Sequence, residues 1–157
     1  MTHHQSDDGI ELGFLLGLGF QLLLGEFTRR LEEAGHDDGL RPLHGMAFQA
    51  LGARGATATE LAERLGVTKQ AAGQIVDDLE RRGYVRREPH PEGGRRKLVV
   101  LTGAAHGHLR AAGRILHELE AELGRGSVDL GTLRAELGLL VRALNGDGPL
   151  PALRPVW

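Results

Sequence analysis

Two glutamines spaced four residues apart offer the most specific chemistry in this sequence. Gln70 and Gln74 lie in a stretch whose apolar residues recur at helical spacing, and they fall on the opposite side of that helix. The apolar residues are Ala72, Ile75, Val76 and Leu79. A glutamine amide both donates and accepts hydrogen bonds, so it can pair with N6 and N7 of adenine. The pattern predicts a helix whose outward face reads base edges in the major groove of DNA.

A second, shorter helix is predicted just before this one. Thr57 and Glu60 have the spacing of a capping box, which marks a helix start. Gly66 can take the left-handed conformation that often ends a helix, and Thr68 is a good N-cap for the next one. Two short helices joined by a tight turn predict a helix-turn-helix. Its second helix would present its N-terminal residues, Lys69 among them, to the major groove.

A β-hairpin is predicted directly after the helix-turn-helix. The β-rich runs YVRR and KLVVL flank the turn-forming stretch EPHPEGG, which is typical of a hairpin with a flexible tip, or wing. Arg95, Arg96 and Lys97 lie at this tip, and Arg86 and Arg87 lie on the first strand. These positions favour contact with phosphate or with the adjacent minor groove. The predicted DNA contacts are Thr57, Thr68, Lys69, Gln70, Gln74, Arg86, Arg95, Arg96 and Lys97.

The distribution of charge matters more here than its sum. The net charge is −2, which by itself argues against a polyanionic partner. However, residues 54–97 carry ten basic and seven acidic side chains, whereas residues 1–53 carry three basic and eight acidic ones. Residues 98–157 are balanced, with six of each. The basic excess is therefore confined to the predicted helix-turn-helix and wing.

The remaining predicted elements are helices. Apolar residues nearly surround the first half of a long helix over residues 10–35, which indicates burial on more than one side, by its own domain and by a second subunit. Pro42 and Gly52 bound another helix. Thr102 is a predicted N-cap for a helix that runs to about residue 123, and a last helix covers about residues 128–144. The fold class is therefore mainly α with a small β-wing.

Several classes of protein are disfavoured. The chain has no cysteine, which excludes disulfides, thiolate metal sites and thiol redox switches. His106 and His108 are spaced i, i+2 and so point to different sides of a helix, which disfavours a metal site. No paired-carboxylate, Ser/His/Asp or phosphate-loop pattern indicates an enzyme, and no cofactor is expected. The apolar run at residues 10–24 is too short to span a membrane, and no secretory signal is evident, so we expect a soluble cytoplasmic protein without a membrane partner.

The stretch TATELAERLGVTKQAAGQIVDDLERRGYVRREPHPEGGRRKLVVLT, residues 57–102, resembles the MarR family of bacterial transcription regulators. The resemblance extends over roughly residues 10–145, because the flanking helices fall where that family has its dimerisation helices. It implies a homodimer on a pseudo-palindromic double-stranded DNA operator. In that family a wing arginine within an Asp-x-Arg pattern enters the minor groove. Arg95 fits this arginine, but Gly93 stands at the acidic position, which implies a looser wing.

The resemblance also gives the expected domain organisation. Residues 10–35 would form an N-terminal dimerisation helix, and residues 36–102 a winged helix-turn-helix DNA-binding lobe. Residues 103–145 would form C-terminal dimerisation helices, and residues 146–157 an irregular tail.

The resemblance further implies a repressor that is released by a small effector, often aromatic, bound between the dimerisation helices and the DNA-binding lobe. Phe14, His44 and Phe48 are the candidate lining residues, although plain core packing is the more common role for such residues. A winged-helix protein-interaction module without DNA binding stays open as an alternative. Asp77 and Asp78 favour it, because acidic side chains near phosphate are unfavourable.

Overall fold

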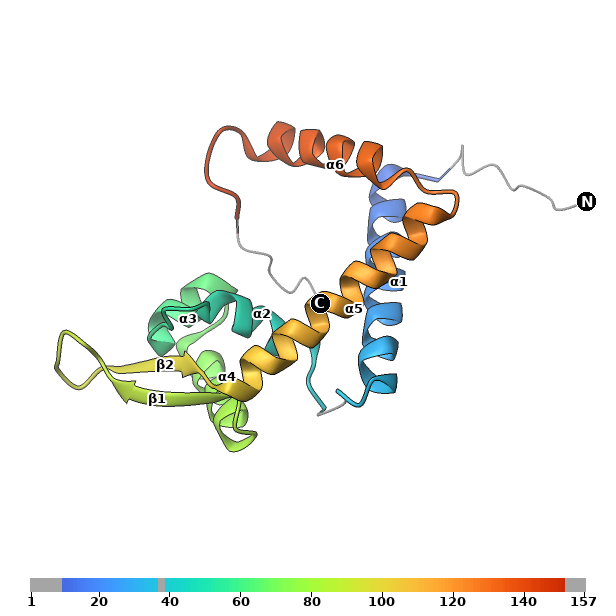
Figure 1. Cartoon of the computed structure of the whole chain (residues 1–157). Helices are drawn as coiled ribbons and strands as arrows, with labels where there is room; N and C mark the ends of the chain where they lie inside the picture. Colours follow the sequence, from blue (N-terminus) through green and yellow to red (C-terminus); the bar gives the residue numbers. More distant parts are fainter. Residues whose placement is uncertain (1–9, 37–38, 152–157) are drawn as a thin grey trace, which may run out of the picture. The chain divides into compact units, whose positions relative to one another are not determined.

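The computed structural model describes residues 10–36 and 39–151 (Figure 1). In chain order the elements are α1 (Leu12–Glu33), α2 (Pro42–Leu51), α3 (Ala58–Leu65), α4 (Lys69–Arg81), β1 (Val85–Pro89), β2 (Lys97–Leu101), α5 (Gly103–Arg125) and α6 (Leu130–Asn145). The chain divides between residues 37 and 38 into two units. Helix α1 belongs to the first unit and all other elements belong to the second. The predicted class, mainly α with a small β-wing, is confirmed.

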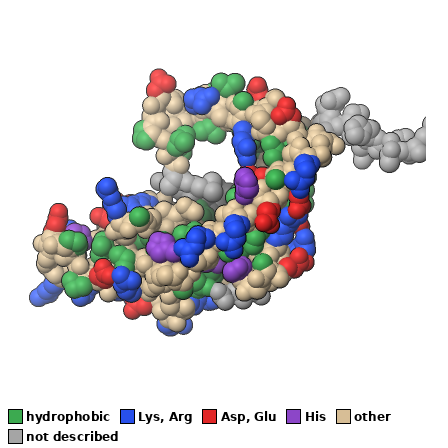
Figure 2. Space-filling model, in the orientation of Figure 1, with side chains coloured by type: hydrophobic (Ala, Val, Ile, Leu, Met, Phe, Trp, Pro, Cys, Tyr) green, Lys and Arg blue, Asp and Glu red, His purple; other side chains and the backbone are tan. Residues whose placement is uncertain are grey.

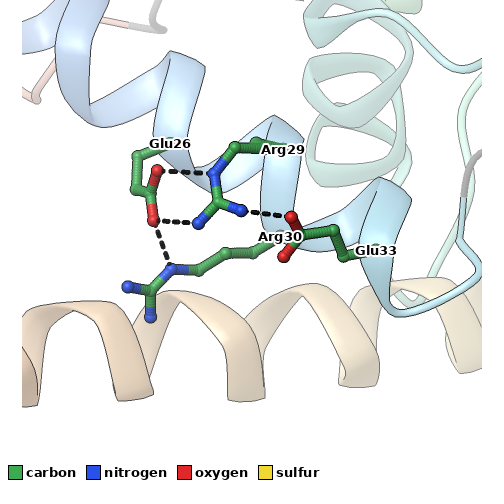
Figure 3. A network of polar contacts seen from close by, with 4 residues as sticks. All are labelled: Glu26, Arg29, Arg30 and Glu33. Carbon is green, nitrogen blue, oxygen red and sulfur yellow. Dashed lines mark hydrogen bonds and ion pairs between the residues drawn. The ribbon is translucent and has the colours of Figure 1, made fainter.

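Helix α1 has an apolar N-terminal half and a charged C-terminal half. No residue of this helix is buried within the single chain, and Leu12, Phe14 and Leu22 are 60%, 64% and 66% exposed. Burial of this apolar face by a second subunit stays a prediction. In the charged half, Glu26 accepts hydrogen bonds from Arg29 and Arg30, and Arg29 also pairs with Glu33 (Figure 3). The hydrogen bonds from Arg29 and Arg30 lower the pKa of Glu26 to about 2.

The core of the second unit lies where α2, α3, α4, the hairpin and the start of α5 meet. Its largest fully buried side chains are Phe48, Leu51, Leu61, Leu65, Val76, Leu79 and Val99. Phe48 packs against the rings of Tyr84 and His108, with centroid distances of 5.5 and 5.8 Å. The core therefore joins the helix-turn-helix to the base of the hairpin and to α5, which fixes where the exposed faces of α4 and the hairpin lie.

Local capping explains the boundaries of the helix-turn-helix. The Thr57 hydroxyl accepts the Glu60 N–H at 3.2 Å, and the Glu60 carboxylate accepts the Thr57 N–H at 3.1 Å, so the predicted capping box is confirmed. Gly66 ends α3 in the left-handed conformation, with φ of 66°. The Thr68 hydroxyl then accepts the Ala71 N–H at 3.1 Å and begins α4.

The hairpin is held at its base by the loop between α2 and α3. Strands β1 and β2 are antiparallel, with Val85 opposite Leu101 and Pro89 opposite Lys97. Ala56 forms an isolated bridge to Val99 through backbone hydrogen bonds of 2.8 and 3.0 Å. Gly55 makes this approach possible, because its φ is +72° and a Cβ there would lie 2.4 Å from the Val99 carbonyl oxygen.

Three boundaries differ from those expected. Strand β1 continues through Pro89, two residues beyond the end of the YVRR run, because Glu88 and Pro89 still lie opposite β2. Thr102 is at the N-cap position of α5, but its side chain accepts no capping hydrogen bond; its hydroxyl donates instead to the Gly83 carbonyl oxygen at 2.6 Å. Helix α6 begins two residues later than residue 128, where Asp129 caps it by accepting the Thr132 N–H at 3.0 Å.

In the parts of the chain that the structure describes, no helix is both long and apolar enough to cross a lipid bilayer.

Candidate nucleic-acid interface

Helix α4, the recognition helix of the predicted helix-turn-helix, has a buried face and an open face. Ala72, Val76 and Leu79 are fully buried against the core. Gln70 and Gln74 lie on the other side and are exposed, as is Lys69 in the first turn. Both amides are therefore free to meet a base edge without any rearrangement of the core, which is the geometry that direct readout requires. Their contact with DNA stays a prediction.

The two threonines among the predicted contacts hold the starts of the helices. Each hydroxyl oxygen accepts a backbone N–H, from Glu60 for Thr57 and from Ala71 for Thr68. The hydroxyl proton of each threonine is not used by that bond, so it can still be donated to a phosphate oxygen. Thr57 is half-buried, whereas Thr68 is exposed beside Lys69.

The tip of the wing, which comprises residues 90–96 between β1 and β2, is built on two glycines. Gly93 and Gly94 have φ of +78° and +83°, a conformation that other residues rarely adopt. The acidic residue nearest to the expected position is Glu92, and it pairs with Arg96 at 3.5 Å. Both partners are largely exposed, so this pair contributes little to holding the tip. Arg95 makes no side-chain hydrogen bond or ion pair within residues 10–36 and 39–151, which leaves its guanidinium available.

The two arginines on β1 differ in what they contact. Arg86 pairs with Glu88 on the same strand at 2.7 Å, and its side chain is 59% exposed. An exposed pair of this kind is weak and does not prevent a phosphate contact. Arg87 instead turns toward α4 and pairs with Asp77 at 2.6 Å and with Glu80 at 2.5 Å. Two carboxylates of α4 therefore hold the Arg87 guanidinium in the chain without DNA, and a contact of Arg87 with phosphate stays a prediction.

The two aspartates that favoured a protein-interaction module are both paired within the chain. Asp77 contacts Arg87, and Asp78 contacts Arg82 at 3.0 Å and Arg81 at 3.3 Å. Partial desolvation raises the pKa of Asp78, but the hydrogen bond from Arg82 and its charge outweigh this effect, so the pKa lies below its ordinary value. Asp78 is thus neutralised locally, whereas Asp77 shares one arginine with Glu80, so the protein-interaction module stays open as an alternative.

His44 joins α2 to the recognition helix. Its side chain is 9% exposed, its Nδ1 accepts the Arg41 N–H at 2.8 Å, and its Nε2 lies 3.1 Å from the Asp78 carboxylate. Burial lowers the pKa of His44 below 6.5, although the Asp78 charge opposes this. The neutral ring therefore donates through Nε2 to Asp78. Sequence reasoning did not find this contact, since the two residues are far apart along the chain.

This contact predicts a pH-dependent stability. Because the folded-state pKa of His44 lies below its unfolded value of 6.5, its contribution is present above that pH and is lost as the pH falls through the folded pKa. We expect the free energy of unfolding in urea to fall below pH 6.5, and we expect His44→Gln to flatten this dependence. The same substitution at His117, which is exposed, is the control. Parallel curves for wild type and His44→Gln would contradict the prediction.

The three candidate effector residues have different environments. Phe48 is fully buried in the core of the second unit, and His44 is 7% exposed. Phe14 lies on α1 in the first unit and is 64% exposed. Core packing thus explains Phe48 and the Asp78 contact explains His44, while an effector role for all three residues stays a prediction. Among the described residues, no three His, Asp or Glu side chains gather into a metal-binding group.

Comparison with known proteins agrees with this geometry. The model of the MarR family matches residues 38–96, which include α2, the helix-turn-helix and most of the wing. The HTH-type transcriptional regulator YcgE of Bacillus subtilis is 36% identical over 69 residues, or 44% of this chain. The matched stretch spans 45% of that relative, less than half of its length.

Solved structures extend the likeness to most of the chain. A mutant of MepR from Staphylococcus aureus, bound to an oligodeoxyribonucleotide, is 19% identical with a TM-score of 0.61, covering 86% of this chain and 99% of that one. CouR from Rhodococcus jostii RHA1, bound to p-coumaroyl-CoA, is 22% identical with a TM-score of 0.66, covering 89% and 95%. At these identities the likeness is one of fold.

Proposed function

We propose that the chain is a sequence-specific DNA-binding regulator of transcription of the MarR family, whose model matches residues 38–96, and that it acts as a homodimer. The main observation behind this proposal is that one face of α4 is exposed to solvent. Lys69, Gln70 and Gln74 are exposed there, on a helix whose opposite face is locked into the core. Two such helices, one from each copy, would dock in major grooves about one helical turn apart on a pseudo-palindromic operator. The wing that follows would bring Arg95 toward the adjacent backbone or minor groove.

The exposed apolar side chains of the last helix support a homodimer. Figure 2 shows such side chains along α6, the helix at the top of the view. Leu139, Val141 and Leu144 of this helix are 54%, 43% and 81% exposed. An apolar surface of this kind is usually covered by a partner. Helix α1 has a second exposed apolar surface, which includes Leu12, Phe14 and Leu22. We therefore assign both helices to contact with a second copy of the chain.

Release of DNA by a small aromatic effector is the finer part of the proposal. It is supported by CouR, which is similar in fold and was solved with p-coumaroyl-CoA bound. Phe14 is the one of the three candidate lining residues that a ligand could reach without disturbing the core, because His44 and Phe48 are buried. A repressor role follows from the same proposal, since an effector that frees DNA restores transcription.

A binding experiment tests the function. Genomic fragments retained by the purified protein would be sequenced, and the affinity for the recovered site would be measured over a range of salt concentrations. We expect a pseudo-palindromic site and a logarithmic affinity that falls linearly with the logarithm of salt, with a slope of about −0.9 per phosphate neutralised. Gel filtration should give a dimer. No retained site, or binding that does not respond to salt, would contradict the proposal.

A further inference from the structure

We infer that Arg87 is a positioning residue for DNA binding, which sets the angle between the wing and the recognition helix by bridging Asp77 and Glu80. The inference rests on the proposed function, because this angle matters for binding only if the wing and α4 contact one duplex. It assigns Arg87 a role different from that of the exposed arginines of the wing, which are predicted to touch DNA themselves.

The geometry of the bridge is specific. Asp77 and Glu80 are three residues apart and therefore lie side by side on one face of α4. The two terminal nitrogens of Arg87 divide between them, with one 2.6 Å from Asp77 Oδ1 and the other 2.5 Å from Glu80 Oε2. A planar guanidinium held by two carboxylates at once has little freedom to rotate. The bridge therefore fixes direction as well as distance.

Exposure and charge fit a positioning role. The side chain of Arg87 is 31% exposed, compared with 59% for Arg86 beside it on the same strand. The hydrogen bond with Asp77 raises the pKa of Arg87 above its ordinary value, and the one with Glu80 adds to this. The cluster of Arg87, Asp77 and Glu80 has one positive and two negative side chains, so its net charge does not attract a phosphate. The contribution of the bridge to overall stability is modest because water screens the exposed acids.

The wing depends on this bridge because few other contacts hold it beyond its base. Tyr84 and Val85 are buried, but residues 88–97 make no hydrogen bond or ion pair with α4 among the described residues. The strand rises about 3.3 Å per residue, so the tip near Gly93 lies up to about 20 Å from Arg87. A tilt of about 10° at Arg87 would then move the tip by about 3 Å, which exceeds the tolerance of a hydrogen bond.

The composition of the tip makes the bridge more important. Gly93 occupies the place of the acid expected to hold the wing arginine, and the Glu92–Arg96 pair is long and exposed. Arg95 has no partner among the described residues that would fix its direction. Orientation of Arg95 must therefore come from the base of the hairpin, where Arg87 meets α4.

The experiment compares two ways of breaking the bridge. One variant is Arg87→Gln, and the other combines Asp77→Asn with Glu80→Gln. If Arg87 were a phosphate contact, removing the acids would free it and would leave DNA binding unchanged or stronger. If it positions the wing, both variants should weaken binding by a similar factor, about tenfold for the loss of the wing contacts. Combining all three substitutions should add little, because they act on one interaction. Arg86→Gln, on the same strand, removes a predicted phosphate contact and leaves the bridge intact, so it should weaken binding and make the dependence of affinity on salt shallower.

A second measurement needs no DNA. The chain has no cysteine, so spin labels can be placed at Glu63→Cys on α3 and Pro91→Cys at the wing tip without a background signal. Both positions are exposed. With labelled chains diluted in unlabelled ones, so that a homodimer carries one labelled copy, we expect one narrow distribution of distances between the labels for wild type and for Arg86→Gln. The distribution should broaden for both bridge variants, while Arg87→Lys, which can reach one carboxylate at a time, should lie between.

The two measurements separate the inference from the proposed function. An unchanged label distribution in both bridge variants would overturn the positioning role, even if DNA binding fell. Broadening without any DNA binding by wild type would overturn the proposed function and leave the bridge as the support of the wing. Circular dichroism and the unfolding midpoint identify a variant that fails to fold. In that case the other bridge variant still decides the question.

Discussion

Replacing Gln70 and Gln74 together by alanine is expected to remove most of the preference for the operator over other DNA. Each bidentate contact between an amide and adenine discriminates by about 1–3 kcal/mol, so the pair would account for roughly 2–6 kcal/mol in each copy of the homodimer. The ratio of the two dissociation constants, for the operator and for a scrambled duplex, should then fall by at least about 10³-fold, because both copies lose their contacts. Both side chains are exposed and make no contact with the core, so the fold should be retained.

The measurement is a titration of each duplex, repeated at several salt concentrations so that the slope of the logarithmic affinity against the logarithm of salt serves as an internal check. Gln70→Ala and Gln74→Ala remove no charge, so the slope should stay that of wild type. Lys69→Ala is the control, because it should weaken binding to both duplexes alike and make the slope shallower by about 2, one unit for each copy of the homodimer. An unchanged ratio of dissociation constants would mean that α4 does not read bases.

The largest effect on stability is expected from Phe48→Ala. The Phe48 side chain is fully buried, with the rings of Tyr84 and His108 within 6 Å between centroids. Truncating a buried phenylalanine costs about 3–5 kcal/mol, which is a large share of the roughly 5–15 kcal/mol that stabilises a domain. Urea unfolding at neutral pH would measure the loss. Phe48→Leu should cost much less, because it preserves most of the side-chain volume.

This substitution also decides between two roles for Phe48. Phe14→Ala is its comparison, since that side chain is 64% exposed and should leave the second unit as stable as before. If Phe48→Ala kept wild-type stability and changed only the response to an aromatic compound, Phe48 would line a ligand site and not the core.

Local signals in the sequence predicted the elements of the helix-turn-helix closely. Thr57, Glu60 and Gly66 act within one helix turn of where they stand, and the structure confirms each of them. The amphipathic spacing of Ala72, Val76 and Leu79 likewise fixed which face of α4 is open. Such features are predictable because their energetics depend on near neighbours.

The side-chain network around α4 could not be predicted in the same way. Arg87 meets Asp77 across ten positions, Thr102 meets Gly83 across 19, and His44 meets Asp78 only after α2 and α4 have packed. Each of these side chains had a plausible local role, as a phosphate contact, an N-cap or an effector contact. In the folded chain each of these side chains instead contacts a partner that is distant in the sequence. That contact is the one that the structure shows.

Gly55 limits how far this sequence can diverge without losing its wing. Its backbone has a positive φ, and a Cβ at this position would lie 2.4 Å from a backbone oxygen of Val99, an atom that cannot move aside without breaking the bridge to Ala56. The exposed residues of α4 and the tip can vary to suit another operator. Position 55 cannot vary in the same way. In a descendant of this chain that has lost this glycine, we therefore expect the base of the hairpin to be rebuilt, even where the DNA preference has not changed.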